Sequence, residues 1–173
     1  NEAPPEMKLE YVPLDIARHE YEAFQLVITP NSSFSTLKVS ITDGKTKEGY
    51  TLPTSQFKVF KVEYVSIKEL SDYYGELTDY PDPIVPVTDL VPVTPGENVV
   101  LWIRVYAPKG QVSGLYEGDI LLEFGGSSIK VPYKVKVYNY NLPLETSTET
   151  AYGVYPDFSW HGPVNEEQKR EIF

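Results

Sequence analysis

Four acidic residues, Asp72, Glu76, Asp79 and Asp82, lie close together in a Tyr- and Pro-rich stretch of the chain. Hydrolysis of a glycosidic bond usually needs two carboxyl groups placed across the sugar. Nothing in the local sequence marks one of these acids as a proton donor, and loop carboxylates commonly accept hydrogen bonds from their own backbone. We therefore predict that this acidic cluster is solvated and contains no catalytic residue.

The same stretch offers oxygen ligands for calcium at Asp79, Asp82 and Asp89. Calcium takes about six to eight oxygen ligands, often from loops. The regular D-x-D-x-D-G pattern of calcium loops is absent, however. The chain has no Cys, and His19 and His161 do not stand at a zinc-binding spacing. We predict no metal site and no cofactor.

Aromatic side chains are the other candidates for binding, above all Tyr73, Tyr74 and Tyr80, with Asp82 beside them. Flat rings with polar tips stack well on the faces of sugars. The same rings could instead pack against a neighbouring domain, and the apolar, Pro-containing residues 84–87 that follow favour this interpretation. Both alternatives, carbohydrate contact and inter-domain contact, stay open at this point.

A catalytic triad is suggested by residue type alone at Asp157, Ser159 and His161. Closeness in sequence does not create triad geometry, and the nucleophile-elbow motif is missing. We predict no triad here. Trp160, which lies among these residues, is a further aromatic candidate for contact with a sugar or a neighbouring domain.

Charge and composition exclude several classes of function. Lys and Arg number 15 and Asp and Glu number 25, which gives a formal net charge of −10. We expect no nucleic-acid partner, because such proteins need a basic face. No apolar run reaches the length of about 18 residues that would span a bilayer, so we expect no membrane insertion. The 173 residues suit one domain, or one domain with part of a second.

Alternation of apolar and polar residues predicts strands along most of the chain. Residues 97–107 are apolar or aromatic on both faces, which predicts a central strand covered on both sides, with Trp102 between the sheet and a partner. Residues 116–124 and 129–138 predict a hairpin with cross-strand charge pairs. Further strands are expected at 7–11, 14–18, 21–29, 36–42 and 57–67. The pattern as a whole predicts an all-β, immunoglobulin-like antiparallel β-sandwich.

Two stretches depart from this alternation. Residues 70–96 are long and Pro-rich, which predicts a loop that is functional or packed on a partner. Near the C-terminus, residues 150–155 predict a strand, and Asn165 with Gln168 marks the start of a helix. We therefore predict a β-sandwich over 1–144, then a linker and the first βα unit of a truncated (β/α)8 barrel over 145–173. The first residue is Asn, and we expect a processed or trimmed N-terminus.

Six short motifs occur in a fixed order along residues 8–155. They are HEYEAFQLV (19–27), YYG with YPDP (73–75 and 80–83), LWIRVYAP (101–108), GLYEG (114–118), VYNYNLP (137–143) and AYG (151–153). Together they resemble the N-terminal β-sandwich of bacterial glycoside hydrolase family 123 proteins and of the related domain of unknown function 4091. Three positions differ from that pattern, because His19, Ser113 and Asn139 stand where the family has Asn, Pro and Asp.

This resemblance implies an accessory domain that braces a catalytic (β/α)8 barrel and helps to line its substrate cleft. The parent enzyme is implied to be an N-acetyl-β-galactosaminidase, whose adjacent Asp-Glu pair assists the reaction. No Asp-Glu dipeptide occurs in this chain, so we predict that the chain alone is not an enzyme. Its expected partner is its own C-terminal catalytic domain, and Trp160 and His161 would follow the first barrel strand, on the active-site side.

Two other functions fit a β-sandwich, since fold alone does not decide function. One is an independent carbohydrate-binding module that uses the Tyr-rich loop 72–82. The other is an immunoglobulin-like spacer domain at a cell surface. For all three functions we expect an extracytoplasmic location, in the periplasm, at the cell surface or secreted.

Overall fold

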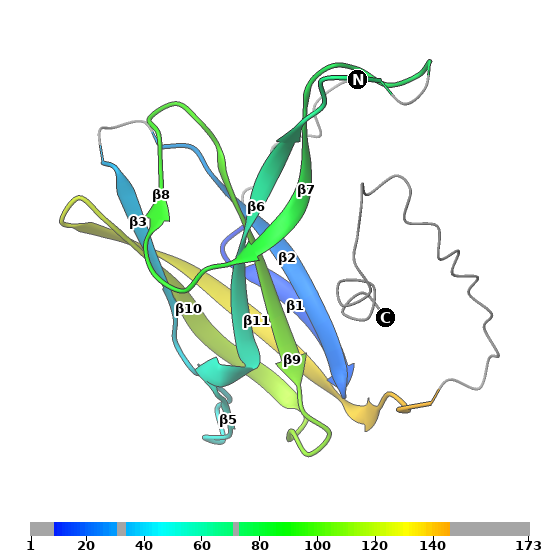
Figure 1. Cartoon of the computed structure of the whole chain (residues 1–173). Coiled ribbons are helices and arrows are strands. Elements are labelled where there is room, and N and C mark those ends of the chain that lie inside the picture. Colours follow the sequence, from blue (N-terminus) through cyan, green and yellow to red (C-terminus); the bar gives the residue numbers. More distant parts are fainter. Residues whose placement is uncertain (1–8, 31–33, 71–72, 146–173) are drawn as a thin grey trace, which may run out of the picture. The chain divides into compact units, whose positions relative to one another are not determined.

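The computed structural model of the chain describes residues 9–30, 34–70 and 73–145. The chain divides into Asn1–Pro143 and Leu144–Phe173, and the fold described here is that of the first unit. Its strands form two sheets (Figure 1). The larger sheet contains β1 (Val12–Arg18), β3 (Thr36–Ile41), β4 (Gly44–Lys45), β5 (Thr51–Leu52), β8 (Val91–Pro92), β10 (Gly114–Phe124) and β11 (Ser127–Asn141). The smaller sheet contains β2 (Glu20–Ile28), β6 (Phe57–Ser66), β7 (Asp79–Pro86) and β9 (Val99–Ala107).

The order of strands places β9 and β10 at the centre of their sheets. The larger sheet runs β1-β11-β10-β3-β8, with β4 paired to β10 and β5 paired to β4. The smaller sheet runs β2-β9-β6-β7. A short 3-10 helix, Thr54–Gln56, precedes β6. The predicted all-β sandwich is therefore confirmed for the described residues. The immunoglobulin-like topology stays a prediction, and the predicted barrel unit lies outside the described residues.

The core lies between the two sheets and follows the alternation of the strands. On β9, every second residue from Val99 to Ala107 is buried and belongs to the core. These side chains meet Tyr116, Ile120 and Leu122 of β10, together with the inward residues of β11. Burying one large aliphatic side chain contributes roughly 1.5–3 kcal/mol, so this layer is the main source of stability.

The hairpin of β10 and β11 confirms the clearest prediction from the sequence. Its outward acids and lysines pair across strands, as Lys134 does with Glu117 at 2.7 Å between Nζ and Oε1. The hydrogen bond and charge of Lys134 lower the pKa of the Glu117 carboxyl. Pro132 is tolerated in the long strand β11 because β1 pairs only from Tyr133 onward, which leaves Pro132 without a partner on that side.

The core contains one very close approach, between Gly118 of β10 and Tyr133 of β11. Tyr133 lies beneath Gly118, and a Cβ at Gly118 would collide with the phenol ring. The Tyr133 hydroxyl donates to the Thr42 carbonyl at 2.8 Å, and its ring packs on Phe57 with 5.2 Å between centroids. Burial raises the pKa of the Tyr133 phenol well above its ordinary value. Only glycine fits at position 118 while Tyr133 keeps this place.

The prediction that all strands are antiparallel is wrong for one ladder. β1 runs parallel to β11, from Val12 beside Tyr133 to Ile16 beside Val137. These strands lie at opposite ends of the domain sequence, so no short connection forces them to run in opposite directions. The predicted strand at 7–11 is also wrong where the structure describes it, because residues 9–11 precede β1 and are not in a strand.

The long loop predicted over 70–96 is wrong as well, because this stretch contains β7 and β8. β7 includes Pro81, Pro83 and Pro86, which disguise the strand in the sequence. Proline cannot donate a hydrogen bond to a central ladder, but it is tolerated on an edge strand. β7 is such an edge, since it pairs only with β6.

Candidate functional site

The outward faces of the two sheets differ sharply in chemistry. The larger sheet presents charged residues, among which Lys38, Lys130 and Lys134 each form an ion pair with an acid of β10. A face of this kind, which consists of paired charges, is stable in contact with water. The outward residues of the smaller sheet are mostly aromatic or aliphatic. Large apolar areas on a protein surface usually mark an interaction site.

We call the outward side of the smaller sheet the aromatic face. Strand register places its side chains in rows, with Gln25, Trp102 and Phe60 in one row and Tyr21 beside Tyr106 in another. The Tyr21 and Tyr106 rings stack with 4.4 Å between centroids. The aromatic face consists of Tyr21, Ala23, Gln25 and Val27 of β2, Val100, Trp102, Arg104 and Tyr106 of β9, and Lys58, Phe60 and Val62 of β6.

Burial on the aromatic face confirms that these residues point away from the core. Val62 and Val100 are both buried, yet neither belongs to the cluster between the sheets. Trp102 is half-buried, and Tyr21 and Val27 remain 58% and 54% exposed. The domain thus has a second apolar layer on this side, and it is partly exposed in the part of the chain that the structure describes.

A two-stranded extension of β6 and β7 adjoins this face, and we call it the hairpin arm (residues 62–70 and 73–84). β9 pairs with β6 only as far as Lys61, so beyond that residue β6 and β7 pair with each other alone (Figure 1). Every residue of β7 is exposed. A two-stranded hairpin by itself is only marginally stable in water. The arm therefore has little stability of its own.

The hairpin arm carries four of the candidate residues from the sequence. Tyr73 and Tyr74 are 93% and 92% exposed, and their rings meet edge to face with 5.8 Å between centroids. Tyr80 lies on β7 opposite Val65, and Asp82 is exposed on the same strand. The structure thus places Tyr73, Tyr74, Tyr80 and Asp82 on one arm, although they lie on a strand and a turn and not on the loop that was predicted.

The chain leaves β11 beside the aromatic face. The Leu142 N–H donates to the Arg18 carbonyl at 2.9 Å, and the Leu142 carbonyl oxygen lies 3.3 Å from Nδ1 of His19. The His19 ring in turn meets Tyr106 edge to face at 6.2 Å. His19 has a φ of 63°, a conformation in which His and Asn are among the preferred non-glycine residues. This explains why His can replace the Asn of the family pattern.

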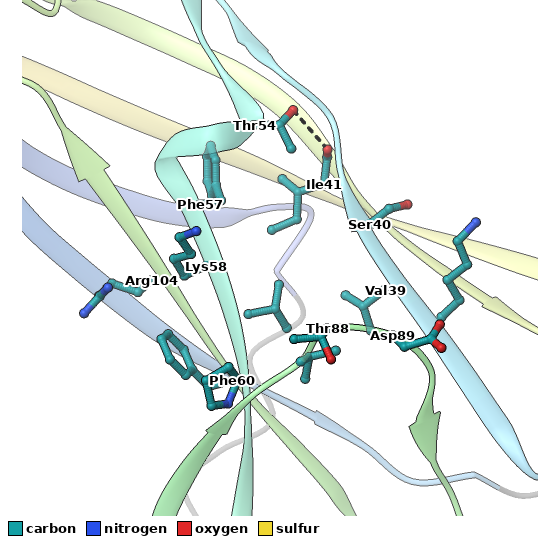
Figure 2. Close-up of a pocket in the computed structure, with 14 residues that line it drawn as sticks. Val39, Ser40, Ile41, Thr54, Phe57, Lys58, Phe60, Thr88, Asp89 and Arg104 are labelled. Atoms are coloured by element: carbon teal, nitrogen blue, oxygen red, sulfur yellow. Dashed lines mark hydrogen bonds between the residues drawn. The ribbon is translucent and has the colours of Figure 1, made fainter.

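A groove of about 700 Å³ lies where β6 faces β3, across the open side of the sandwich (Figure 2). Val39 and Ile41 of β3 and Phe57 of β6 supply apolar walls. Figure 2 shows Lys58 and Arg104 together on the side of the aromatic face. The groove is thus an extension of that face around the edge of β6.

The geometry can be compared with known proteins. The sequence pattern of the glycoside hydrolase 123 N-terminal domain matches residues 18–123, which is more than half of the chain. The chain belongs to this family. A comparison with curated proteins found no match.

Among solved structures, the domain is similar to a family 123 glycoside hydrolase from Clostridium perfringens that was studied for glycolipid glycan hydrolysis. The TM-score is 0.70 and the identity 20%, over 80% of this chain and 24% of that one. The chain thus spans about a quarter of the length of that enzyme, and at this identity the likeness shows the fold. The fimbrial subunit MyfA from Yersinia enterocolitica matches with a TM-score of 0.40 and 13% identity, over 76% of this chain and 93% of that one.

The remaining candidate residues from the sequence include some that the structure describes and some that it does not. Trp160 and His161 lie outside the described residues and stay predictions. Asp79 accepts a hydrogen bond from the Ser66 hydroxyl, as expected for an acid that satisfies local donors. Across 9–30, 34–70 and 73–145 no group of three potential metal ligands is present. Within the same ranges, no helix has the length and apolar character needed to cross a bilayer.

The sequence predicts only part of the aromatic face. The apolar alternation on both sides of residues 97–107 predicts a strand covered on both sides, with Trp102 between the sheet and a partner, but it does not show that Tyr21 and Phe60 share that side. The structure shows that β9 is central, but its second side is uncovered in the described part of the chain. The position of Lys58 directly beside Arg104 depends on strand register, which the sequence does not reveal.

Proposed function

We propose that this domain is a non-catalytic accessory module that packs its aromatic face and hairpin arm against the catalytic domain of the same glycoside hydrolase. The observation that carries the proposal is the contrast between the two outward faces. One is ion-paired and suited to water, and the other is aromatic. A domain that worked as an isolated spacer would have no need for this second apolar layer.

Energetics support the same function. Aromatic side chains each bury roughly 150–250 Å² when fully covered and dominate the energetics of interfaces. At about 25 cal/mol per Å², covering two of them would contribute several kcal/mol before the cost of association. The hairpin arm would gain as well, because a third element would complete its two strands. Packing of this kind would brace the catalytic domain, and an arm of this length would line one side of its substrate cleft.

The point where the chain leaves the sandwich also supports docking on this face. Leu142 is held against Arg18 and His19, and His19 contacts Tyr106 of the aromatic face. Whatever follows Pro143 therefore begins next to the proposed interface.

The parent protein extends the proposal. In keeping with the family, we take it to be a glycosidase acting on terminal N-acetyl-β-galactosaminides, with residues 145–173 as the linker and first βα unit of its barrel. Trp160 and His161 would then lie near the substrate, and the protein would work outside the cytoplasm. The catalytic Asp-Glu pair should be found beyond Phe173, since this chain has none.

Hydrogen exchange provides the test. Backbone amides of the arm and of β9 are measured in the chain of residues 1–173 and in the intact natural protein. We expect the arm amides to exchange rapidly in the chain alone and to be protected in the intact protein. The variant Phe60→Asp should abolish that protection, whereas Ser128→Asp, on the exposed turn of the other sheet, should not. Equal exchange of the arm in both proteins would refute docking.

A second function is favoured by one observation, the nearly complete exposure of the Tyr73 and Tyr74 side chains. Rings exposed to this extent could form a platform for a sugar. A carbohydrate-binding module would bind a glycan as the isolated chain and lose that binding in Tyr73→Ala and Tyr74→Ala. A docking module would bind no simple glycan by itself, and a spacer would show neither binding nor docking. Titration of the chain with neutral oligosaccharides, followed by NMR, separates these outcomes.

A further inference from the structure

Two cations lie side by side in the middle of the aromatic face. Lys58 of β6 is directly opposite Arg104 of β9 in the strand register. They are the only charged residues at the outward positions of β2, β9 and residues 57–62 of β6. No acid within the described ranges forms an ion pair with either of them. In a chain with a net charge of −10, an unneutralised pair of cations at this place is unusual.

The Arg104 guanidinium is held in position by aromatic rings and not by a counter-ion. Its Cζ lies 4.7 Å from the centroid of the Tyr21 ring and 5.4 Å from that of Phe60. Cation–π contacts of this kind favour the cation and fix its orientation, but they leave its net charge in place. Like charges directly across two strands are destabilising, so the pair does not improve the stability of the isolated domain.

Covering the aromatic face would make this pair far more costly. An ion that loses its water in an interface carries a large desolvation penalty unless an opposite charge meets it. A carboxylate supplies that opposite charge most directly, because it can accept hydrogen bonds from a lysine and an arginine at the same time. An apolar partner surface would leave two buried, uncompensated cations.

Resting on the proposed docking, we infer that the catalytic domain presents an acidic side chain to Lys58 and Arg104. The carboxylate lies at the corner of the groove, where Figure 2 shows Lys58, Phe60 and Arg104 together. This charge pairing fixes the register of the interface, while the surrounding rings supply the apolar contact. Lys58 and Arg104 thus serve recognition of the catalytic domain and not folding.

Zero-length crosslinking of the intact natural protein tests the inference. A carbodiimide joins a lysine amine to a carboxylate in direct contact, and peptide mapping by mass spectrometry then identifies both residues. We expect Lys58 to be joined to an Asp or Glu that follows Pro143 in the sequence. Lys58→Arg keeps the charge and removes the amine, so this crosslink should vanish while the arm stays protected. Crosslinks of Lys58 only to acids within residues 1–143, or no crosslink of Lys58 at all, would overturn the inference.

Charge reversal separates the inference from the proposed function. The double variant Lys58→Glu with Arg104→Glu should raise arm exchange in the intact protein to the rate of the isolated chain. The control, Lys130→Glu with Lys136→Glu, makes the same change in net charge on the other sheet and should leave exchange unaltered. Circular dichroism of the variant chains of residues 1–173 checks that each still folds. If the chain with Lys58→Glu and Arg104→Glu does not fold, Lys58→Gln with Arg104→Gln takes its place.

The outcomes are distinct. If Phe60→Asp exposes the arm and the charge reversal does not, docking stands and the acidic partner is refuted. If neither variant alters the arm, both the docking and the inference fail. If the isolated chain binds a sulfated or carboxylated glycan through Lys58 and Arg104, the cations serve a ligand and the inference is wrong.

Discussion

Two adjacent residues of β9, Trp102 and Ile103, provide a sharp test of whether the aromatic face is made for docking. By size alone, Trp102 should be the more damaging residue to truncate, because a fully buried Trp→Ala change costs about 3–5 kcal/mol. In the structure, however, Ile103 is completely buried in the core, whereas Trp102 lies half-buried on the outward side. The order of the two effects should therefore be reversed in the chain of residues 1–173.

The expected magnitudes follow from the contacts. Ile103→Ala removes a side chain with 0% exposure from the layer between the sheets, for which we expect a loss of about 2–5 kcal/mol. Trp102→Ala loses its cross-strand contacts with Gln25 and Phe60, which are worth roughly 0.2–1 kcal/mol each. At the middle of these two ranges, Ile103→Ala should be the more destabilising change by about 2 kcal/mol.

Urea denaturation followed by circular dichroism measures both free energies of unfolding without using Trp fluorescence, which the substitution alters. The slopes of free energy against urea concentration should match that of the wild type, so that midpoints can be compared directly. A loss for Trp102→Ala equal to or greater than that for Ile103→Ala would refute the reasoning. It would mean that the side chains of the aromatic face stabilise the isolated domain as core residues do and are not available to bind a partner.

Further predictions concern the core and the ion-paired face. Gly118→Ala should lower the free energy of unfolding by about 1–3 kcal/mol through collision with Tyr133, and the loss should shrink in a Tyr133→Leu background, as a double-mutant cycle would show. Because the folded-state pKa of Tyr133 is raised, stability should be full below about pH 10 and fall as the pH rises further; Tyr133→Phe should remove this part of the alkaline loss in thermal melts. The pKa of Glu117 is lowered by Lys134, so its contribution should be present at neutral pH and disappear as the pH falls below about 4; Glu117→Gln should flatten that limb of the stability profile slightly. Tyr73→Ala should leave the midpoint of unfolding unchanged, because the side chain is 93% exposed, and a clear shift would show that the arm is needed for folding.

The sequence predicts the fold best where neighbouring strands are joined by short turns. Alternation from Tyr116 to Val137, interrupted by Gly125 and Gly126, fixes both strands of the β10–β11 hairpin and their outward charges. The parallel pairing of β1 with β11 brings together residues more than a hundred positions apart, and no local pattern specifies it. β7 was missed because its prolines break the usual strand signal, and only its edge position makes them acceptable.

The candidate site was predictable in part. Exposed tyrosines in an acidic, Pro-rich stretch identified Tyr73, Tyr74, Tyr80 and Asp82, and the structure brings them to one arm. Of the aromatic face only Trp102 was predicted to lie against a partner, because an apolar residue has the same pattern whether it faces the core or a partner. The distinction depends on how many layers cover β9, which is a property of the whole fold.

The anchoring of Leu142 beside His19 has a consequence for how tightly the two domains need to bind. Because the chain leaves the sandwich next to Tyr106, a catalytic domain joined after Pro143 would, under the proposed docking, meet the aromatic face as part of the same molecule. A short tether gives an effective concentration on the order of millimolar, so contacts too weak to hold two separate proteins together suffice within one chain. The aromatic face can therefore remain modest in size, and the same two domains produced as separate polypeptides should dissociate at micromolar concentrations.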